Sequence, residues 1–208
     1  MKLLTRSMGA AAAAAALVAA GTRPAQATTG TTSLAEVLAA DGDTFDGRWG
    51  DYDVVTEAVN AVLAAKPGSP VAVLADGTVP LTAFIPDDRA FRVLVQDITG
   101  TAPADDEAAF AAVAGLGIDT VETVLLYHVV PGATIDSATA AASDGAALTT
   151  AQGGAVTVKV NGPGNIRLVD ADAGDRNPKL EVPRLDINAG NQQIAHGVTL
   201  VLRPVDLP

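Results

Sequence analysis

Residues 125–132, Leu-Leu-Tyr-His-Val-Val-Pro-Gly, change their structural period in the middle of the stretch. Upstream of it, apolar residues recur at spacings of three and four, which predicts a helix that ends near Tyr127. The two valines after His128 favour an extended chain, and Pro131-Gly132 predicts a turn. A helix that runs directly into a strand lies where two layers of a fold meet. We therefore expect Tyr127 and His128, whose polar tips need hydrogen-bond partners, to sit at that joint.

Helical patterns dominate the first half of the chain. Ser33 followed by Glu36 forms a capping box at the start of a short helix. Apolar periodicity and flanking Gly or Pro residues predict further helices at residues 54–65, from residue 86 onward, and at residues 107–115. Residues 134–142 predict either a short helix or an irregular loop.

Strand patterns dominate the second half, where we expect strands at residues 147–150, 155–161, 165–169, 185–187 and 195–207. Earlier in the chain, residues 71–74 and 79–85 predict a hairpin around the turn Asp76-Gly77. No internal repeat appears at a fixed spacing. The chain therefore predicts a single α+β domain, with helices packed against a mainly antiparallel β-sheet wedge or sandwich.

The first 27 residues have the features of a secretory signal peptide. Lys2 and Arg6 precede an apolar run, and Ala25-Gln26-Ala27 is a small-x-small cleavage site. The apolar run is too short to span a membrane, and no later stretch is long enough. We expect a signal peptide at residues 1–27 and a secreted, extracellular domain at residues 28–208, with its core from about residue 33 and no membrane span.

The charge balance excludes one class of partner. The formal net charge is −11, and the signal peptide holds three of the 13 basic residues and no acid. The mature chain therefore has ten basic and 24 acidic side chains, a net charge of −14. Such a surface repels phosphate backbones, which argues against a nucleic-acid partner. Aromatic residues are only 3% of the chain, which argues against extensive platforms for stacking sugars or bases.

Catalytic motifs are absent from the sequence. The chain has no cysteine, no His-Glu-x-x-His, no Gly-x-Ser-x-Gly and no phosphate-binding glycine loop. The best alternative is a hydrolase-like arrangement in which His128 acts as a base oriented by Asp88 or Asp87. The competing interpretation is structural: Tyr127 and His128 hydrogen-bond the start of the helix at Pro86 and lock the two halves together. We expect no catalysis, no cofactor and no metal.

Three motifs resemble the signatures of the fasciclin (FAS1) domain family. Residues 82–91, Thr-Ala-Phe-Ile-Pro-Asp-Asp-Arg-Ala-Phe, are similar to its first signature, and residues 125–132 to its central Tyr-His signature. Residues 195–202 are similar to its second signature, although His196 and Leu200 replace the usual Asn and His. The resemblance covers roughly residues 33–208 and is closest to secreted, single-domain bacterial members. It assigns structural signature roles to Thr82, Phe84, Pro86, Asp88, Phe91, Tyr127, His128, Pro131, Gly132 and Gly197.

Residues 170–183 look like a polar insertion relative to that family. Asp170, Asp172 and Glu181 fall at positions one, three and twelve of a calcium-loop spacing, but Gly174 and Asp175 reverse the order of ligand and glycine that such a loop needs. A solvated turn is the favoured interpretation. We name Asp170, Asp172, Asp175 and Glu181 as candidate partner-binding residues.

The family resemblance implies an adhesion or interaction module. The expected partner is a cell-surface or extracellular-matrix protein or glycoconjugate, contacted through exposed loops at residues 41–52, 100–106 and 170–183.

Overall fold

The computed structural model describes residues 30–40, 45–205 and 207. The predicted signal peptide and its cleavage point before Thr28 lie outside these residues. The described helices are α1 (Leu34–Ala39), α2 (Asp53–Ala65), α3 (Asp88–Thr99), α4 (Asp106–Ala114), α5 (Ile118–Tyr127) and α6 (Ser137–Ala141). Two 3₁₀ helices, η1 (Pro70–Ala75) and η2 (Val182–Arg184), complete the helical elements.

Side-chain caps explain where several helices begin. Ser33 and Glu36 form the predicted capping box at α1. The side chains of Asp87, Asp105 and Asp136 accept hydrogen bonds from the backbone at the starts of α3, α4 and α6. Each bond satisfies one of the amide groups that have no partner in the first helical turn.

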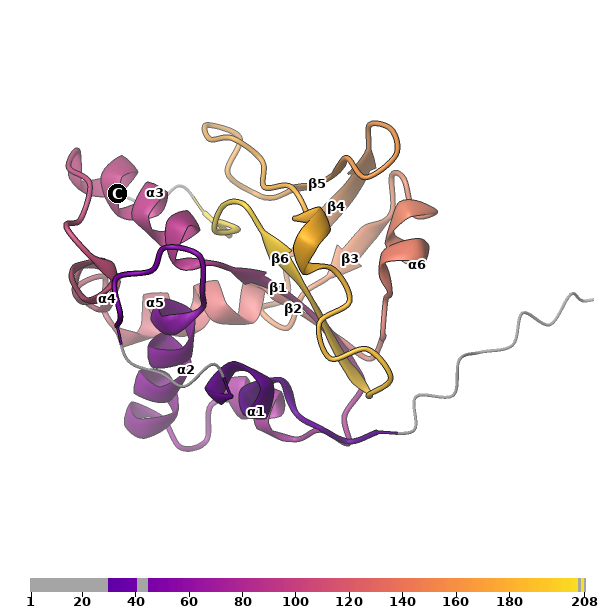
Figure 1. Ribbon diagram of the computed structural model, residues 1–208, viewed down its shortest axis with the longest axis horizontal. Coiled ribbons are helices and arrows are strands. Elements are labelled where there is room, and N and C mark those ends of the chain that lie inside the picture. The colour runs from indigo at the N-terminus through magenta and orange to yellow at the C-terminus, as the bar shows by residue number, and fades with distance from the viewer. Residues whose placement is uncertain (1–29, 41–44, 206, 208) are drawn as a thin grey trace, which may run out of the picture.

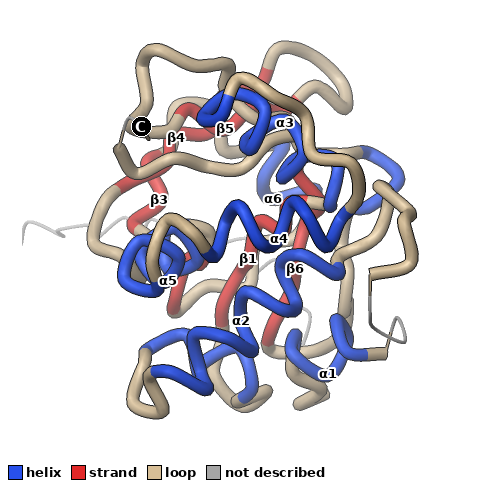
Figure 2. Tube along the Cα trace, turned by 90° about the vertical axis from the view of Figure 1, so that its left-hand side faces the viewer, coloured by secondary structure: helices blue, strands red, loops and turns tan. Residues whose placement is uncertain are grey.

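Two three-stranded sheets form the β structure. The central sheet has the order β2 (Val129–Pro131), β1 (Leu81–Pro86), β6 (Gln193–Val198). The second sheet has the order β3 (Ala147–Thr149), β4 (Ala155–Val160), β5 (Ile166–Val169). Figure 1 shows α1–α5 gathered on one side of the central strands, and the second sheet with α6 on the other. Turned by 90°, Figure 2 shows the helices in front of β1 and β6.

The central strand β1 is covered on both faces, and all six of its residues are buried. Leu81, Ala83 and Ile85 pack into the core beneath the helices, whereas Phe84 packs into a second core against β4 and β5. Strand alternation explains this division, because successive side chains point to opposite faces. The predicted α+β class is confirmed, and three of the four paired ladders are antiparallel.

The predicted hairpin at residues 71–85 is wrong. Residues 70–75 form η1 instead, which begins at Pro70 and is capped by the Ser69 side chain. The partners of β1 are β2, antiparallel, and β6, parallel. A short apolar run does not distinguish a strand from a helical turn, and proline at the first position favours the helical turn.

In the second half, the predicted strands at residues 147–150, 155–161 and 165–169 correspond to β3, β4 and β5. Residues 134–142 contain α6, the first of the two alternatives. The last strand is shorter than predicted, because β6 ends at Val198 and does not continue to residue 207. Residues 185–187 form no strand of their own; Ile187 makes an isolated bridge to Ala195.

No single described helix is long and apolar enough to cross a membrane. The α4–α5 pair passes by combined length and composition, but the chain bends by 108° between the two helices.

Candidate functional site

His128 lies at the junction of α5 and β2, where the helical period was predicted to end. Its Nδ1 atom lies 2.7 Å from the Val124 carbonyl oxygen, and its Nε2 atom accepts a hydrogen bond from the Leu202 amide at 2.9 Å. Because Nε2 accepts, the neutral ring carries its proton on Nδ1 and donates it to Val124. The imidazole therefore connects the end of α5 to the chain that follows β6.

Burial makes His128 a poor base. The residue is 5% exposed, and desolvation lowers the pKa of the imidazole from 6.5 to about 4, against the opposing effect of the Val124 hydrogen bond. The ring is neutral at pH 7, and both of its nitrogens are already occupied by backbone groups.

Tyr127, the other residue of the joint, reaches the second sheet. Its hydroxyl donates a hydrogen bond of 2.8 Å to the Ala155 carbonyl in β4, and the residue is 1% exposed. Its ring lies so close to Gly154 that a Cβ atom there would approach it to 3.0 Å. Tyr127 is thus part of the core, as predicted.

The predicted partners of this joint were wrong. Tyr127 and His128 bond to Ala155, Val124 and Leu202, and not to the start of α3. The hydrolase alternative lacks the contact between base and carboxylate that it needs. Asp88 accepts a hydrogen bond from the Val54 amide, and no hydrogen bond joins it to His128 in the described chain.

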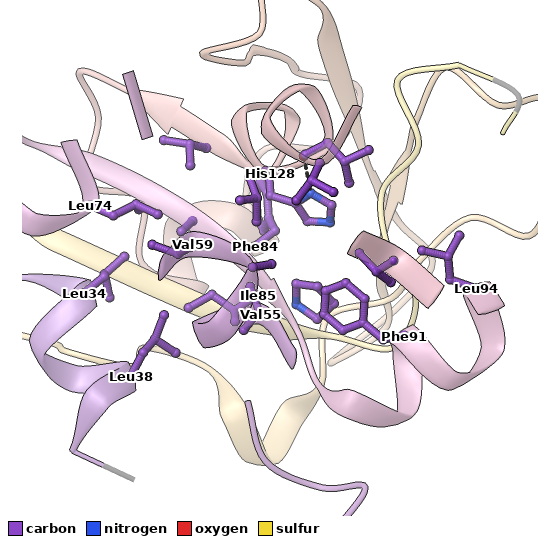
Figure 3. A pocket seen from close by; sticks show the side chains of 18 of the residues that line it. Leu34, Leu38, Val55, Val59, Leu74, Phe84, Ile85, Phe91, Leu94 and His128 are labelled. Carbon is purple, nitrogen blue, oxygen red and sulfur yellow. Dashed lines mark hydrogen bonds between the residues drawn. The ribbon is translucent and has the colours of Figure 1, made fainter. Parts of the chain in front are cut away.

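An apolar pocket lies beside His128 and forms part of the core (Figure 3). Phe84, Phe91 and Leu125 are among the side chains that line it, and His128 is its only titratable lining residue. A polar cleft opening on His128 would favour catalysis. Closure by apolar side chains instead fits the structural interpretation.

The remaining signature residues hold neighbouring segments together. Thr82 Oγ1 donates to the Ala133 carbonyl and accepts from the Ile135 amide, both at 2.8 Å. Gly132 has φ +79°, a conformation that favours glycine, and its amide bonds to Pro80. Pro131 is the exposed end of β2, and Pro86 pairs with Val198 at the end of β1.

Gly197 is required by close packing. A Cβ atom there would lie 2.8 Å from Arg184 Cβ and 3.2 Å from the Tyr52 hydroxyl.

His196 lies in β6 and is fully buried. Its ring stacks on Phe84, Nε2 lies 2.8 Å from the Ile135 carbonyl, and Nδ1 accepts from the Asp186 amide at 3.2 Å. In both described histidines, the two ring nitrogens therefore contact backbone groups.

Three of the four candidate binding acids turn inward and surround Arg203. The guanidinium lies 3.6 Å from the Asp172 carboxylate and 3.0 Å from that of Asp175, and the Arg203 amide donates to Asp170 at 3.0 Å. Asp97 of α3 adds a further contact at 2.9 Å. Asp172 is only 4% exposed, so the prediction of a solvated turn is wrong for this residue.

Glu181, the fourth candidate, lies apart from the other three. Its carboxylate is 3.4 Å from Arg184, which also pairs with Asp87 at 3.0 Å. The calcium-loop spacing of Asp170, Asp172 and Glu181 therefore does not bring these carboxylates together around one point. The exposed side chains of the insertion include Arg176, Lys179 and Val182.

A second group of carboxylates gathers where three helices begin. Asp53, Asp88 and Asp106 are the first residues of α2, α3 and α4, and all three are buried. One carboxylate oxygen from each lies within 4.8 Å of the others. Asp46 and Asp51 form a second such group with Asp53, closer to solvent.

Backbone amides satisfy part of this cluster. Val54 donates to Asp88 Oδ1 at 3.0 Å, and Glu107 and Gly47 donate to the two oxygens of Asp106. Asp88 Oδ2 and Asp51 Oδ1 are buried without a hydrogen-bond donor. Burial, followed by a hydrogen bond between the protonated Asp88 carboxyl and the neighbouring Asp51 carboxyl, raises the pKa of Asp88 to about 8.

From this cluster the sequence singled out only Asp88, for its place in a signature and as a possible partner of His128. A usable signal was present, because Asp53, Asp88 and Asp106 each precede an apolar helical pattern. An acid at a helix start is common as a partner of the helix dipole, so the pattern does not reveal that the three starts converge.

Comparison with known proteins gives one family. The family model described as Fasciclin domain matches residues 55–204, which confirms the resemblance drawn from the three motifs. No curated protein matches the chain. Among solved structures, a FAS1 domain pair from the insect cell adhesion molecule fasciclin I is similar, with a TM-score of 0.51 and 14% identity. The match covers 72% of this chain and 46% of that one, so this chain spans about half of the pair.

Proposed function

The chain belongs to the fasciclin domain family, and on that premise we propose that it is a secreted interaction module without catalytic activity. Fasciclin domains are generally adhesion domains and are typically extracellular. The proposed partner is a protein or glycoconjugate of a cell surface or an extracellular matrix. The mature net charge of −14 makes a nucleic acid an unsuitable partner.

One observation carries the proposal: the groups best suited to catalysis are used inside the fold. His128 and His196 are buried, and each ring nitrogen faces a backbone group. What the chain offers to other molecules is therefore its loops, the usual location of binding residues on a rigid scaffold.

The insertion at residues 170–183 is the proposed contact loop. Asp172 and Asp175 of this loop face Arg203, while Arg176 and Lys179 are exposed. Val182 is 59% exposed, one of two large hydrophobic side chains exposed in the described residues. A loop of this size gives a small, polar interface, so a single domain binds weakly, with Kd on the order of micromolar, and many copies displayed together bind strongly.

The test compares the retention of displayed wild type with that of displayed variants. Beads carrying residues 28–208 are washed over matrix- or envelope-coated surfaces from the source organism, and retention is measured. The variant combines Arg176→Ala with Val182→Ser, and Lys159→Ala, an exposed lysine of β4, is the control. We expect the double variant to be retained about tenfold less than the wild type, with an unchanged melting temperature.

Two results would contradict the proposal. Equal retention of the double variant and the Lys159→Ala control would remove the insertion as the contact surface. Loss of retention on changing Tyr127 or His128 without unfolding would place the contact at the α5–β2 joint instead.

A further inference from the structure

The carboxylates at the starts of α2, α3 and α4 lack a compensating cation. In the described residues, no Lys or Arg forms an ion pair with Asp51, Asp53, Asp88 or Asp106. The acids of the 170–183 insertion provide an internal comparison, because Arg203 lies among them. Buried carboxyl groups in proteins are normally paired with a cation, coordinate a metal or become protonated, and Asp172 and Asp175 have Arg203 as their cation.

Helix dipoles and amides supply only part of what this cluster needs. Three helix starts each contribute partial positive charge, and amides of Val54, Gly47 and Glu107 donate to its carboxylates. Asp88 is 0% exposed, yet its Oδ2 atom has no donor, and the same holds for buried Asp51 Oδ1. Without a cation, a proton that Asp88 shares with the neighbouring Asp51 carboxyl fills this place, in agreement with the raised pKa of Asp88. A fully buried carboxylate oxygen that has no N–H donor and belongs to a group of converging acids is a place where a bound cation can replace that proton.

We infer that this cluster binds one calcium ion, held by Asp53, Asp88 and Asp106, with Asp51 and Asp46 on its solvent side. Calcium binds oxygen at about 2.3–2.6 Å, so two ligands on opposite sides of the ion are about 5 Å apart. The three buried oxygens lie within 4.8 Å of one another, which fits a shared ion.

The donor set also selects the ion. Every candidate ligand is a carboxylate oxygen, and no cysteine or histidine belongs to either group of acids, which favours calcium over zinc. Magnesium requires near-octahedral geometry and keeps much of its water, which suits a dry cluster of several carboxylates less well. Asp46 is exposed and Asp51 half-buried, so an ion can enter from solvent past them.

The experiment uses the mature chain after treatment with a chelator. The melting temperature is measured with added calcium or magnesium, and calorimetry gives the stoichiometry. Terbium supplies a second readout, because Trp49, the only tryptophan, lies between Asp46 and Asp51 in the chain and can sensitise its luminescence. With calcium about a hundredfold above its Kd, we expect a rise of about 5–10 °C and one ion per chain.

Two variants locate the site. Asp88→Asn keeps the side-chain size but removes a ligand charge, so it should abolish both the calcium-induced rise and the terbium signal. Glu107→Gln removes the same charge from an exposed position in the first turn of α4, and it should leave both unchanged.

Other outcomes overturn the inference. A wild-type chain that shows no shift and no terbium signal binds no ion here. A calcium response that survives Asp88→Asn places the ion elsewhere, and its loss in Asp175→Asn would place it at the insertion. A larger response to magnesium than to calcium would contradict the choice of ion.

Discussion

At the residue scale, His128 acts as a cross-link between backbone segments. Its loss leaves the Val124 carbonyl and the Leu202 amide without their partner inside the core. We expect His128→Ala to cost about 1–3 kcal/mol, mostly from these unsatisfied groups. The melting temperature should fall by about 3–10 °C in thermal unfolding, and an unchanged melting curve would contradict the cross-linking role.

The same residue predicts a pH dependence that a variant can isolate. The pKa of His128 is lowered to about 4 by burial, so the unfolded chain binds more protons than the folded one between pH 6.5 and 4. The stability that the neutral ring contributes is therefore complete above pH 6.5 and is lost as the pH falls towards 4.

We expect the stability of the wild type relative to His128→Gln to fall by about 3 kcal/mol between pH 7 and pH 4. Other titrating groups are common to both proteins and cancel in the difference. Denaturant unfolding at a series of pH values measures the gap. A gap that stays constant across this range would show that the folded histidine titrates normally.

The location of this joint could be predicted from the sequence, but its partners could not. The change of period at His128 is a local pattern, which the chain displays within eight residues. The Ala155 carbonyl and the Leu202 amide lie 28 and 74 residues further along. Backbone groups carry no residue identity, so no sequence pattern marks them as acceptors or donors for a given side chain.

At the scale of elements, Arg203 fastens the insertion to α3 and to the chain after β6. Arg203→Ala leaves the buried Asp172 carboxylate without its cation, and we expect a cost of about 3 kcal/mol. Arg167→Ala removes an exposed arginine from β5 and should change the stability by less than about 0.5 kcal/mol. Chemical denaturation of the two variants checks the difference, and equal stabilities would contradict the role of Arg203.

This arrangement changes how the insertion can be studied. A solvated turn at residues 170–183 could be trimmed to a short turn without harm to the fold, but the structure argues against such a deletion. Trimming would remove Asp172 and Asp175 and leave Arg203, which is 7% exposed, with few partners. Point substitutions at exposed positions such as Arg176 are therefore the better probe of binding.

Helices were predicted more accurately than the first strands. The helix at residues 54–65 and the capping box at Ser33 correspond to α2 and α1, because caps and periodicity act within one element. The hairpin at residues 71–85 failed, since β1 pairs with residues about 50 and 110 positions away. The convergence of Asp53, Asp88 and Asp106 was missed for the same reason: only the packing of α2, α3 and α4 brings them together.

At the scale of the whole molecule, the predicted signal peptide makes a direct test possible. We expect secreted protein to begin close to Thr28, because Ala25-Gln26-Ala27 precedes it as a cleavage site. N-terminal sequencing of protein recovered from the culture medium measures this. Recovery of a chain that still begins at Met1 or Met8 would contradict processing at this site.

The α+β class could be predicted because helical and strand patterns occupy different halves of the chain. The parallel β1–β6 pair could not, since nothing local in residues 81–86 indicates residues 193–198 as neighbours.

That pair also has a consequence for synthesis. The strand that completes the central sheet lies about 110 residues after its partner β1 in the chain, and Gln193 at its start also bonds to Leu34, Val73 and Asp76. Until the ribosome has passed residue 198, β1 has an open edge and α1 lacks one of its attachments. The central sheet therefore closes through a contact of high sequence separation, and because such contacts form slowly we expect the domain to fold slowly.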